Sequence, residues 1–208
     1  MSLLLSKLSN IQSAGSVIAK TISIRSYLCQ RRQQYTFFST IQYSVNDRLA
    51  HITLNRPEVL NSINESMPRE LFECVEKANS DPSVHVIILS GAGRAFCSGY
   101  DLSYYAQNKN EYAVQEMPWD PMKDYTFMKR NTEYFMSLFR SPKPTLCKVH
   151  GDALAGGSDI ALCCDMILMA NEARIGYMPA RVWGCPTTAM WIYRYKPSSS
   201  YSLSINMF

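Results

Sequence analysis

The chain has 208 residues, of which 47% are hydrophobic and 18% are charged, and its formal net charge is +4. This composition is typical of one globular domain with a hydrophobic core, and it excludes a wholly disordered chain. No apolar run reaches the ~18 residues that a transmembrane helix requires, so we expect no membrane span.

The first segment, residues 1–40, holds the excess of positive charge. Residues 1–46 contain five Lys or Arg residues and no Asp or Glu, which leaves 16 basic against 17 acidic residues in the rest of the chain. That near-neutral remainder gives no reason to expect nucleic-acid binding. A Ser-rich segment without acidic residues is typical of a mitochondrial transit peptide, which predicts residence in the mitochondrial matrix. A disordered N-terminal extension is the alternative.

A core domain is expected over residues 41–194. Its first part follows the order strand, strand, helix, strand. These elements are predicted at 41–45, 48–54, 64–79 and 84–89. Asn46-Asp47 supplies the turn between the first two strands, and Asn64 is the expected helix N-cap. The nearly continuous β-branched run at 84–89 predicts a strand buried on both faces.

The second part begins with a polar, aromatic stretch, 103–124, whose Pro118 and Pro121 predict an irregular loop. Helices and strands then alternate again, with elements predicted at 125–140, 145–149, 156–164 and 166–169. Residues 182–194 resemble the start of a further helix, and 195–208 form a divergent Ser/Tyr-rich tail. The alternation of helices and strands indicates a layered α/β fold.

The cysteines and histidines do not predict a metal site. The seven cysteines form no C-x-x-C pair and lie among apolar residues, and the three histidines lack ligand spacing. We therefore expect neither a zinc site nor a disulfide framework.

Two glycine-containing segments are the most informative part of the sequence: GAGRAFCSGYD at 91–101 and GDALAGGSD at 151–159. Each places a glycine-flanked backbone amide beside a short acidic residue. Two such amides, brought together by folding, could hold one carbonyl oxygen that becomes negative during a reaction. Gly156 is expected at a helix N-terminus, where unpaired N–H groups favour an anion. This chemistry indicates enolate formation, whereas close helix packing is the alternative role for the glycines.

These segments resemble the two signature elements of the enoyl-CoA hydratase/isomerase, or crotonase, family. NRPEVLNS at 55–62 and ARIGY at 173–177 extend the resemblance over residues 45–194. It implies a crotonase-like spiral of ββα units that lacks the C-terminal helical region of the family. It also implies acyl-CoA chemistry in fatty acid β-oxidation, with coenzyme A as part of the substrate and no other cofactor, and a homo-oligomer by analogy.

The resemblance also assigns residue roles. It implies that the amides of Tyr100 and Gly156 are the two oxyanion donors and that Asp159 is the catalytic carboxylate. Asp101 is expected to form an Asx-type bond that aims the Tyr100 N–H inward. The implied contacts with substrate and coenzyme are Arg56, Val59, Leu60, Tyr100, Asp101, Leu102, Ser103 and Gly156. Aromatic residues expected to line the acyl pocket or pack in the core are Tyr104, Tyr105, Tyr112 and Trp119.

One departure from the family pattern affects the expected mechanism. Hydratases of the family carry a second glutamate after a proline, and here Ala180 follows Pro179. Hydration across a double bond is best served by two carboxylates, so the departure argues against the ordinary hydratase mechanism. It leaves single-base isomerisation, another thioester reaction or a weakly active homologue. The competing hypothesis is a truncated, non-catalytic homologue that binds coenzyme A weakly or serves as a partner subunit.

Two other enzyme classes fit less well. Residues 91–96 resemble a dinucleotide-binding fingerprint, but Phe96 occupies the position of its third glycine. The sequence contains no G-x-S-x-G motif, which argues against a serine hydrolase with a nucleophile elbow.

Overall fold

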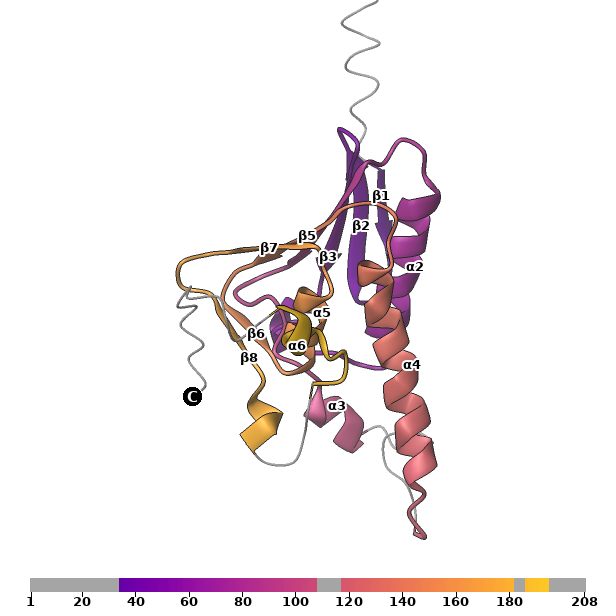
Figure 1. Cartoon of the computed structure of the whole chain (residues 1–208), viewed down its shortest axis with the longest axis vertical. Coiled ribbons are helices and arrows are strands. Elements are labelled where there is room, and N and C mark those ends of the chain that lie inside the picture. Colours follow the sequence, from indigo (N-terminus) through magenta and orange to yellow (C-terminus); the bar gives the residue numbers. More distant parts are fainter. Residues whose placement is uncertain (1–33, 108–116, 182–185, 195–208) are drawn as a thin grey trace, which may run out of the picture. The chain divides into compact units, whose positions relative to one another are not determined.

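Two sheets organise the protein in the computed structural model, which describes residues 34–107, 117–181 and 186–194 (Figure 1). The larger sheet has the strand order β1-β2-β3-β4-β5-β7, and β6 pairs with β8 in a smaller one. The strands are β1 (Gln34–Phe37), β2 (Ile41–Asn46), β3 (Leu49–Leu54), β4 (Val86–Gly91), β5 (Thr145–Val149), β6 (Asp152–Leu154), β7 (Met166–Met169) and β8 (Arg174–Gly176). The helices are α2 (Ser66–Ser80), α3 (Leu102–Gln107), α4 (Pro121–Phe139), α5 (Gly156–Leu162) and α6 (Met190–Arg194), with short 3₁₀ turns η1 (Pro57–Val59) and η2 (Met178–Arg181).

The predicted hairpin at the start of the domain is confirmed. β2 and β3 are antiparallel, and Asn46 pairs with Leu49 at the end of the ladder. The connecting residues Asp47 and Arg48 have φ of 47° and 68°, the left-handed conformations of a two-residue type I′ turn. The turn therefore lies one residue later than predicted. From β3 onward the strands β3, β4, β5 and β7 are parallel, as expected when helices separate them.

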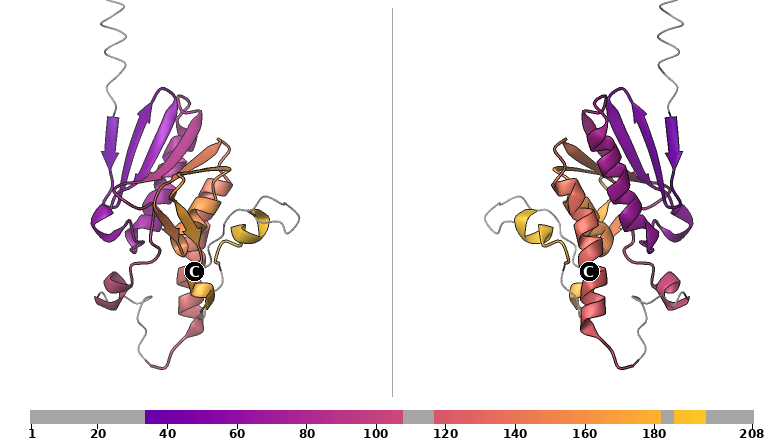
Figure 2. Two further views of the ribbon diagram at one scale, coloured as in Figure 1. Left: turned by 90° about the vertical axis from the view of Figure 1, so that its left-hand side faces the viewer. Right: turned by 90° about the vertical axis from the view of Figure 1, so that its right-hand side faces the viewer.

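Helix α2 packs on β2 and β3, and α4 lies beside α2 and reaches α5 (Figure 2). The apolar stripe of α2 includes Met67, Leu71 and Val75, which are fully buried as the helical spacing predicted. Asn64 Oδ1 accepts a bond of 3.1 Å from the Met67 amide, as expected of a cap, but the N-cap position itself is Glu65, one residue later than predicted. The core therefore lies between this helical layer and one face of the sheet.

The opposite face of β4 corrects a prediction. Ile87 and Leu89 are fully buried, but Val86 and Ile88 are only partly buried, so β4 is covered on one face rather than both. Met166 and Leu168 of β7, which lies beyond β5 in the same sheet, are 54% and 62% exposed. A continuous apolar run shows that both faces of a strand are apolar, but it does not show that other elements cover both faces. In this protein α2 and α4 cover only one face of the sheet.

The stretch 103–124 is more regular than predicted. It includes most of α3 and the first turn of α4, while residues 108–116, with Tyr112, lie outside the described part of the chain. Pro121 does not interrupt a helix but begins one: Asp120 Oδ1 accepts a bond of 2.9 Å from the Met122 amide and caps α4. Proline is favoured at this first helical position because its missing N–H has no partner there anyway.

The start of the folded unit lies earlier than the predicted boundary at residue 41. The unit begins at Tyr35, and β1 falls within the segment predicted to be a leader. Residues 1–33 and 195–208 lie outside the described residues, so the transit peptide and the divergent tail remain predictions. Among the helices that are described, none has the length and apolar character to cross a bilayer.

Glu70 of α2 holds the segment that leads into β2. Its carboxylate accepts bonds from the Ser39 amide at 3.1 Å, the Thr40 amide at 2.8 Å and the Thr40 hydroxyl at 2.7 Å. The Ser39 hydroxyl donates to it as well. Glu70 is only 6% exposed, so its charge is compensated by these donors rather than by water.

We expect Glu70→Ala to lower the free energy of unfolding by about 2 to 3 kcal/mol, because it leaves buried donors without an acceptor. Urea denaturation followed by circular dichroism measures the change. Glu73→Ala is the matched control on the same helix, since Glu73 is exposed and forms only a 3.8 Å ion pair with Arg69. Equal effects of the two substitutions would contradict the anchoring role of Glu70.

Candidate active site

The two glycine-containing segments lie side by side. Cys97 and Ala153 form a parallel bridge, and Leu154 donates to the Cys97 carbonyl at 2.9 Å. A Cβ placed on Gly157 would lie 2.3 Å from that same carbonyl oxygen, which no side chain tolerates. The structure therefore brings the predicted segments together, and glycine at 157 is required by the close approach of two backbones.

Gly99, the residue before Tyr100, adjoins Gly156 at this junction. A Cβ on Gly99 would lie 3.6 Å from the Gly156 nitrogen, so the residue before Tyr100 directly adjoins the start of α5. Ile63 donates to the Gly99 carbonyl at 2.8 Å, and Asp101 donates to the Ile63 carbonyl at 3.0 Å. Because successive amides of an extended segment point in opposite directions, the Tyr100 N–H points away from Ile63.

The Gly156 amide belongs to the first turn of α5, where N–H groups have no acceptor within the helix. Ala155, which precedes it, has φ of 49° and ψ of −122°, a conformation that side chains disfavour. Such strain is typical of functional sites, where the surrounding structure enforces it. Within the described residues, no backbone carbonyl accepts from either the Tyr100 or the Gly156 amide.

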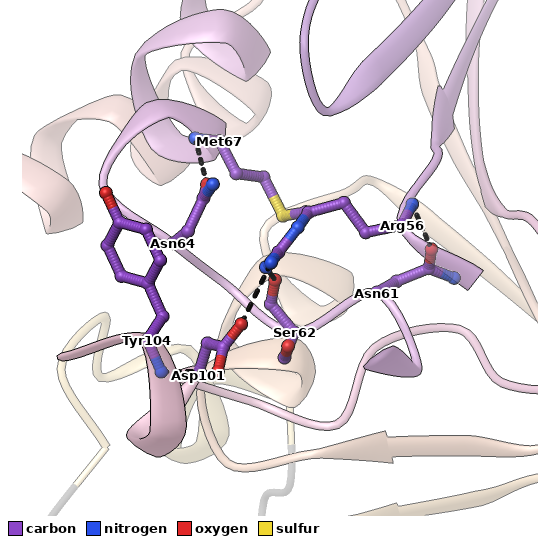
Figure 3. Close-up of polar contacts among 7 residues, drawn as sticks. All are labelled: Arg56, Asn61, Ser62, Asn64, Met67, Asp101 and Tyr104. Atoms are coloured by element: carbon purple, nitrogen blue, oxygen red, sulfur yellow. Dashed lines mark hydrogen bonds and ion pairs between the residues drawn. The ribbon is translucent and has the colours of Figure 1, made fainter. Parts of the chain in front are cut away.

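Asp101 fixes the loop that carries the first of these amides (Figure 3). Its Oδ1 accepts a bond of 2.9 Å from the Tyr104 amide, a side-chain bond to a nearby amide that caps the start of α3. That Asp101 aims the Tyr100 N–H inward stays a prediction. Its Oδ2 lies 3.0 Å from Arg56 Nη2. Burial acts to raise the pKa of Asp101, but the Tyr104 amide and the Arg56 guanidinium outweigh it and lower the pKa below its usual value. Asp101 is therefore held as a carboxylate.

Arg56 has a structural task that the sequence did not indicate. Besides its ion pair with Asp101, its Nη1 donates to the Ser62 carbonyl at 2.6 Å, and its side chain is 16% exposed (Figure 3). The guanidinium thus joins the loop after β3 to the loop after β4. Its expected contact with a coenzyme phosphate remains a prediction.

Asn61 is a residue that the sequence prediction missed. It is fully buried, and its amide nitrogen donates to the carbonyls of Ala92 and Ala95 at 2.8 and 2.9 Å. Its Oδ1 accepts from the Arg56 amide at 2.8 Å, so it ties the NRPEVLNS segment to the first glycine segment. Its φ of 54° is one signal of a special position, since asparagine tolerates the left-handed region.

Asp159 lies one helical turn after Gly156 and is 1% exposed. Its Oδ2 accepts from the Thr187 hydroxyl at 3.0 Å and the Thr187 amide at 3.3 Å, and its Oδ1 accepts from the Thr188 hydroxyl at 3.3 Å. Burial raises the pKa of Asp159 to about 6, and the bonds from the two threonines partly oppose this rise. The carboxylate can therefore change its protonation state near neutral pH.

Thr187 and Thr188 were not identified from the sequence as site residues. Thr188 Oγ1 also accepts a bond of 3.4 Å from the Met190 amide, as expected of a residue that caps α6. A pair of hydroxyl residues just before a helix can thus be recognised in the sequence as a helix cap, but not as part of a site. Their contact with Asp159, nearly thirty residues earlier, depends on the tertiary fold.

The residues expected to contact the coenzyme lie on three separate segments, around η1, at the start of α3 and at the start of α5. Val59 ends η1 and is 36% exposed, and Leu60 follows it with φ of 55°. Leu102 and Ser103 begin α3 beside the first amide, and both are exposed, Leu102 at 78%. An exposed leucine next to the amides is consistent with a ligand-contacting position, although contact itself remains a prediction.

The aromatic residues expected near the acyl group separate into two sets. Tyr105 packs against Tyr100 with ring centroids 6.2 Å apart and against Tyr104 at 5.3 Å. Trp119, in contrast, is 59% exposed and donates to Asp124 at 2.8 Å. Only the first set lies next to a proposed oxyanion donor.

Ala180 lies on η2 and is exposed. The position at which family hydratases carry their second carboxylate therefore offers none here. In the described ranges, no group of three or more His, Cys, Asp or Glu residues is arranged to hold a metal ion.

The family model of enoyl-CoA hydratase/isomerase matches residues 44–195, which include both glycine segments, Asp159 and the threonine pair. The chain belongs to this family. The match starts within β2 and ends just after α6, so it covers nearly the whole described domain.

Individual relatives agree with this membership. The chain is 34% identical over 134 residues to the human mitochondrial Delta(3,5)-Delta(2,4)-dienoyl-CoA isomerase, a match that covers 62% of this chain and 40% of the relative. It is 36% identical over 128 residues to 1,2-epoxyphenylacetyl-CoA isomerase of Escherichia coli, covering 59% and 44%. The crystal structure of an enoyl-CoA hydratase from Mycobacterium smegmatis superimposes with a TM-score of 0.69 and 45% identity, over 76% of this chain and 56% of that one.

The α/β architecture is therefore the crotonase fold of these enoyl-CoA hydratases, as the sequence predicted. The chain spans about half the length of the curated relatives that it matches. The activity of a whole family member is accordingly a proposal for this chain.

Asp159 should decrease the stability of the fold at neutral pH. Its pKa in the folded protein, about 6, lies above the usual value of 3.8, so the folded state binds more protons than the unfolded state between these values. The free energy of unfolding should then fall as the pH rises from 4 to 6. We expect the change in the free energy of unfolding caused by Asp159→Asn to be more stabilising at pH 7.5 than at pH 4, by on the order of 2 kcal/mol.

Urea denaturation of both proteins at the two pH values measures this difference. Asp152→Asn is the matched control, because Asp152 forms an exposed ion pair with Arg174 at 2.7 Å. A difference that is independent of pH would show that burial does not perturb Asp159.

Proposed function

We propose that this protein acts on acyl-CoA thioesters through an enolate, as an enoyl-CoA hydratase/isomerase in fatty acid β-oxidation. The observation that supports it is the junction of the two glycine segments, where Gly99, the residue before Tyr100, adjoins Gly156, with Asp159 one helical turn further along α5. The thioester carbonyl oxygen would accept from both N–H groups. Donors fixed in advance need no reorganisation when the oxygen becomes negative, and each is worth about 3 to 4 kcal/mol in comparable sites.

Asp159 would move the proton. Its carboxylate removes a proton from the carbon next to the carbonyl, and the electron pair of that C–H bond passes to the carbonyl oxygen as the enolate forms. Asp159 then returns the proton to a carbon further along the conjugated chain, so the double bond shifts and no atoms are gained or lost. A pKa of about 6 suits both steps, because the group is mostly ionised at pH 7.5 yet readily protonated.

The single carboxylate favours isomerisation over hydration. Ala180 is exposed and cannot exchange a proton, so a second group for activating water is lacking at that position. Double-bond migration needs only one group that removes and returns the same proton. The competing proposal, a non-catalytic homologue that binds coenzyme A or serves as a partner subunit, predicts binding without turnover.

The catalytic role of Asp159 can be tested by replacing it with asparagine. We expect kcat for isomerisation of a 3-enoyl-CoA to fall by about a hundredfold or more, with a smaller change in KM, because the proton acceptor is lost while the carbonyl contacts remain. In the wild-type protein, kcat should decrease below pH 6 as Asp159 becomes protonated. Steady-state kinetics with 3-hexenoyl-CoA, and hydration of crotonyl-CoA in parallel, provide the measurement.

Asp152→Asn serves as the control, since it removes a half-buried carboxylate, paired with Arg174, from the same sequence segment. Unchanged turnover in Asp159→Asn would remove Asp159 from the mechanism. Thioester binding without turnover by the wild-type protein would support the non-catalytic proposal instead.

We also propose import of the protein into the mitochondrial matrix. The support is compositional: the segment before β1 is rich in Ser and carries five basic and no acidic residues. Residues 1–33 fused to a fluorescent protein should enter mitochondria in cells. Replacing all five basic residues with glutamine should leave the fusion in the cytosol, because import requires positive charge. Equal distribution of the two fusions would contradict this proposal. Homo-oligomerisation, implied by the family, remains a prediction.

A further inference from the structure

The side chain of Tyr100 lies directly over the start of α5. A Cβ placed on Gly156 would be 3.1 Å from Tyr100 Cε2 and 3.2 Å from Cδ2. A methyl group on residue 156 would therefore fit only if the ring moved by a few tenths of an ångström. Tyr100 thus contributes two separate parts to the site: its main-chain amide, at the junction with α5, and a ring that covers one side of the same helix end.

Residues of two helices, α3 and α4, hold the Tyr100 ring in place. Asn131 of α4, which is 1% exposed, donates from Nδ2 to the Tyr100 hydroxyl at 3.4 Å. Tyr105 of α3 packs on the ring at 6.2 Å, and Phe127 of α4 packs edge-on against Tyr105 at 5.9 Å. These contacts leave the ring little freedom to swing away from Gly156.

The hydroxyl of Tyr100 stays protonated at all ordinary pH values. Burial raises its pKa, and the negative charge of Asp159 acts in the same direction, although the bond from Asn131 opposes both. The ring is thus uncharged and fixed next to the start of α5, the helix that carries Asp159.

We propose that the Tyr100 side chain closes the acyl end of the site and limits the protein to thioesters of short acyl chains. This inference rests on the proposed function. A carbonyl oxygen on the Tyr100 and Gly156 amides, with the adjacent carbons facing Asp159, directs the acyl chain past the Tyr100 ring. Because α3 and α4 support that ring, a long chain cannot displace it. The side chain of Tyr100 then sets the acyl-chain selectivity, whereas its backbone amide contributes to the chemistry.

The test compares Tyr100→Ala, Tyr100→Phe and the wild-type protein, since each variant keeps the main-chain amide. Two readouts are used: binding of butyryl-CoA and decanoyl-CoA by isothermal titration calorimetry, and kcat/KM for 3-hexenoyl-CoA and 3-decenoyl-CoA. We expect Tyr100→Ala to shift both ratios toward the longer chain by about tenfold or more, the range that a few methylene contacts provide. Tyr100→Phe keeps the ring and should change the ratios less than about threefold.

Tyr134→Ala is the matched control, because it makes the same chemical change on α4, where Tyr134 packs against Phe72 at 5.4 Å. It should leave the chain-length ratios unchanged. Thermal unfolding of each variant confirms that it is folded, and Asn131→Leu, expected to loosen the ring and shift the ratios in the same direction, provides a second variant if Tyr100→Ala does not fold.

The outcomes separate this inference from the proposed function. Thioester binding or turnover with the same chain-length ratio in folded Tyr100→Ala and wild-type protein overturns the inference alone. Absence of both binding and turnover for every thioester and every variant overturns the proposed function and the inference with it. Binding that shifts with chain length in the absence of turnover supports the inference and contradicts only the catalytic proposal.

Discussion

The site depends on the contact between two stretches of backbone. The bridge between Cys97 and Ala153 brings a loop after β4 against the start of α5, and every proposed chemical element follows from that contact. The approach is possible only because Gly99 and Gly157 have no side chains where the two backbones meet. A hydrogen-bonded junction of this kind is more rigid than a contact between side chains. It can therefore hold two amides in a fixed relation before any ligand arrives.

Several features near the junction cost stability and are compensated nearby. Ala155 adopts a strained backbone conformation, and Asp159 is a carboxylate removed from water. The compensation comes from the Thr187 and Thr188 hydroxyls around Asp159, and from the ion pair of Arg56 with Asp101 in the facing loop.

The sequence predicted the parts of the molecule that follow from local pattern. Strands 145–149 and 166–169 have the predicted bounds, and α2 and α5 begin within two residues of their predicted starts, because periodicity and turn residues are encoded over short distances. The prediction failed where one sequence feature is compatible with two different structures. Pro121 predicts an irregular loop although it starts α4, and the apolar run of β4 predicts burial on both faces although only one is covered.

Long-range contacts were beyond the reach of those patterns. Tyr100, Gly156 and Asp159 could be selected because their motifs resemble a family, and the geometry brings their segments together. Asn61, Asn131 and the two threonines were missed because their roles exist only between elements far apart in the chain. Each is a short polar side chain whose sequence context suggests nothing more than a turn, a cap or a helix surface.

The first proposed donor has an evolutionary consequence. Since the N–H of residue 100 belongs to the peptide unit, every amino acid except proline preserves it, and the tyrosine ring can be exchanged without touching the group that would bear the developing charge. At residue 100 the backbone therefore supports the reaction, whereas the side chain sets the choice of substrate. A single substitution there could change which thioesters the protein accepts during evolution and leave the reaction itself intact.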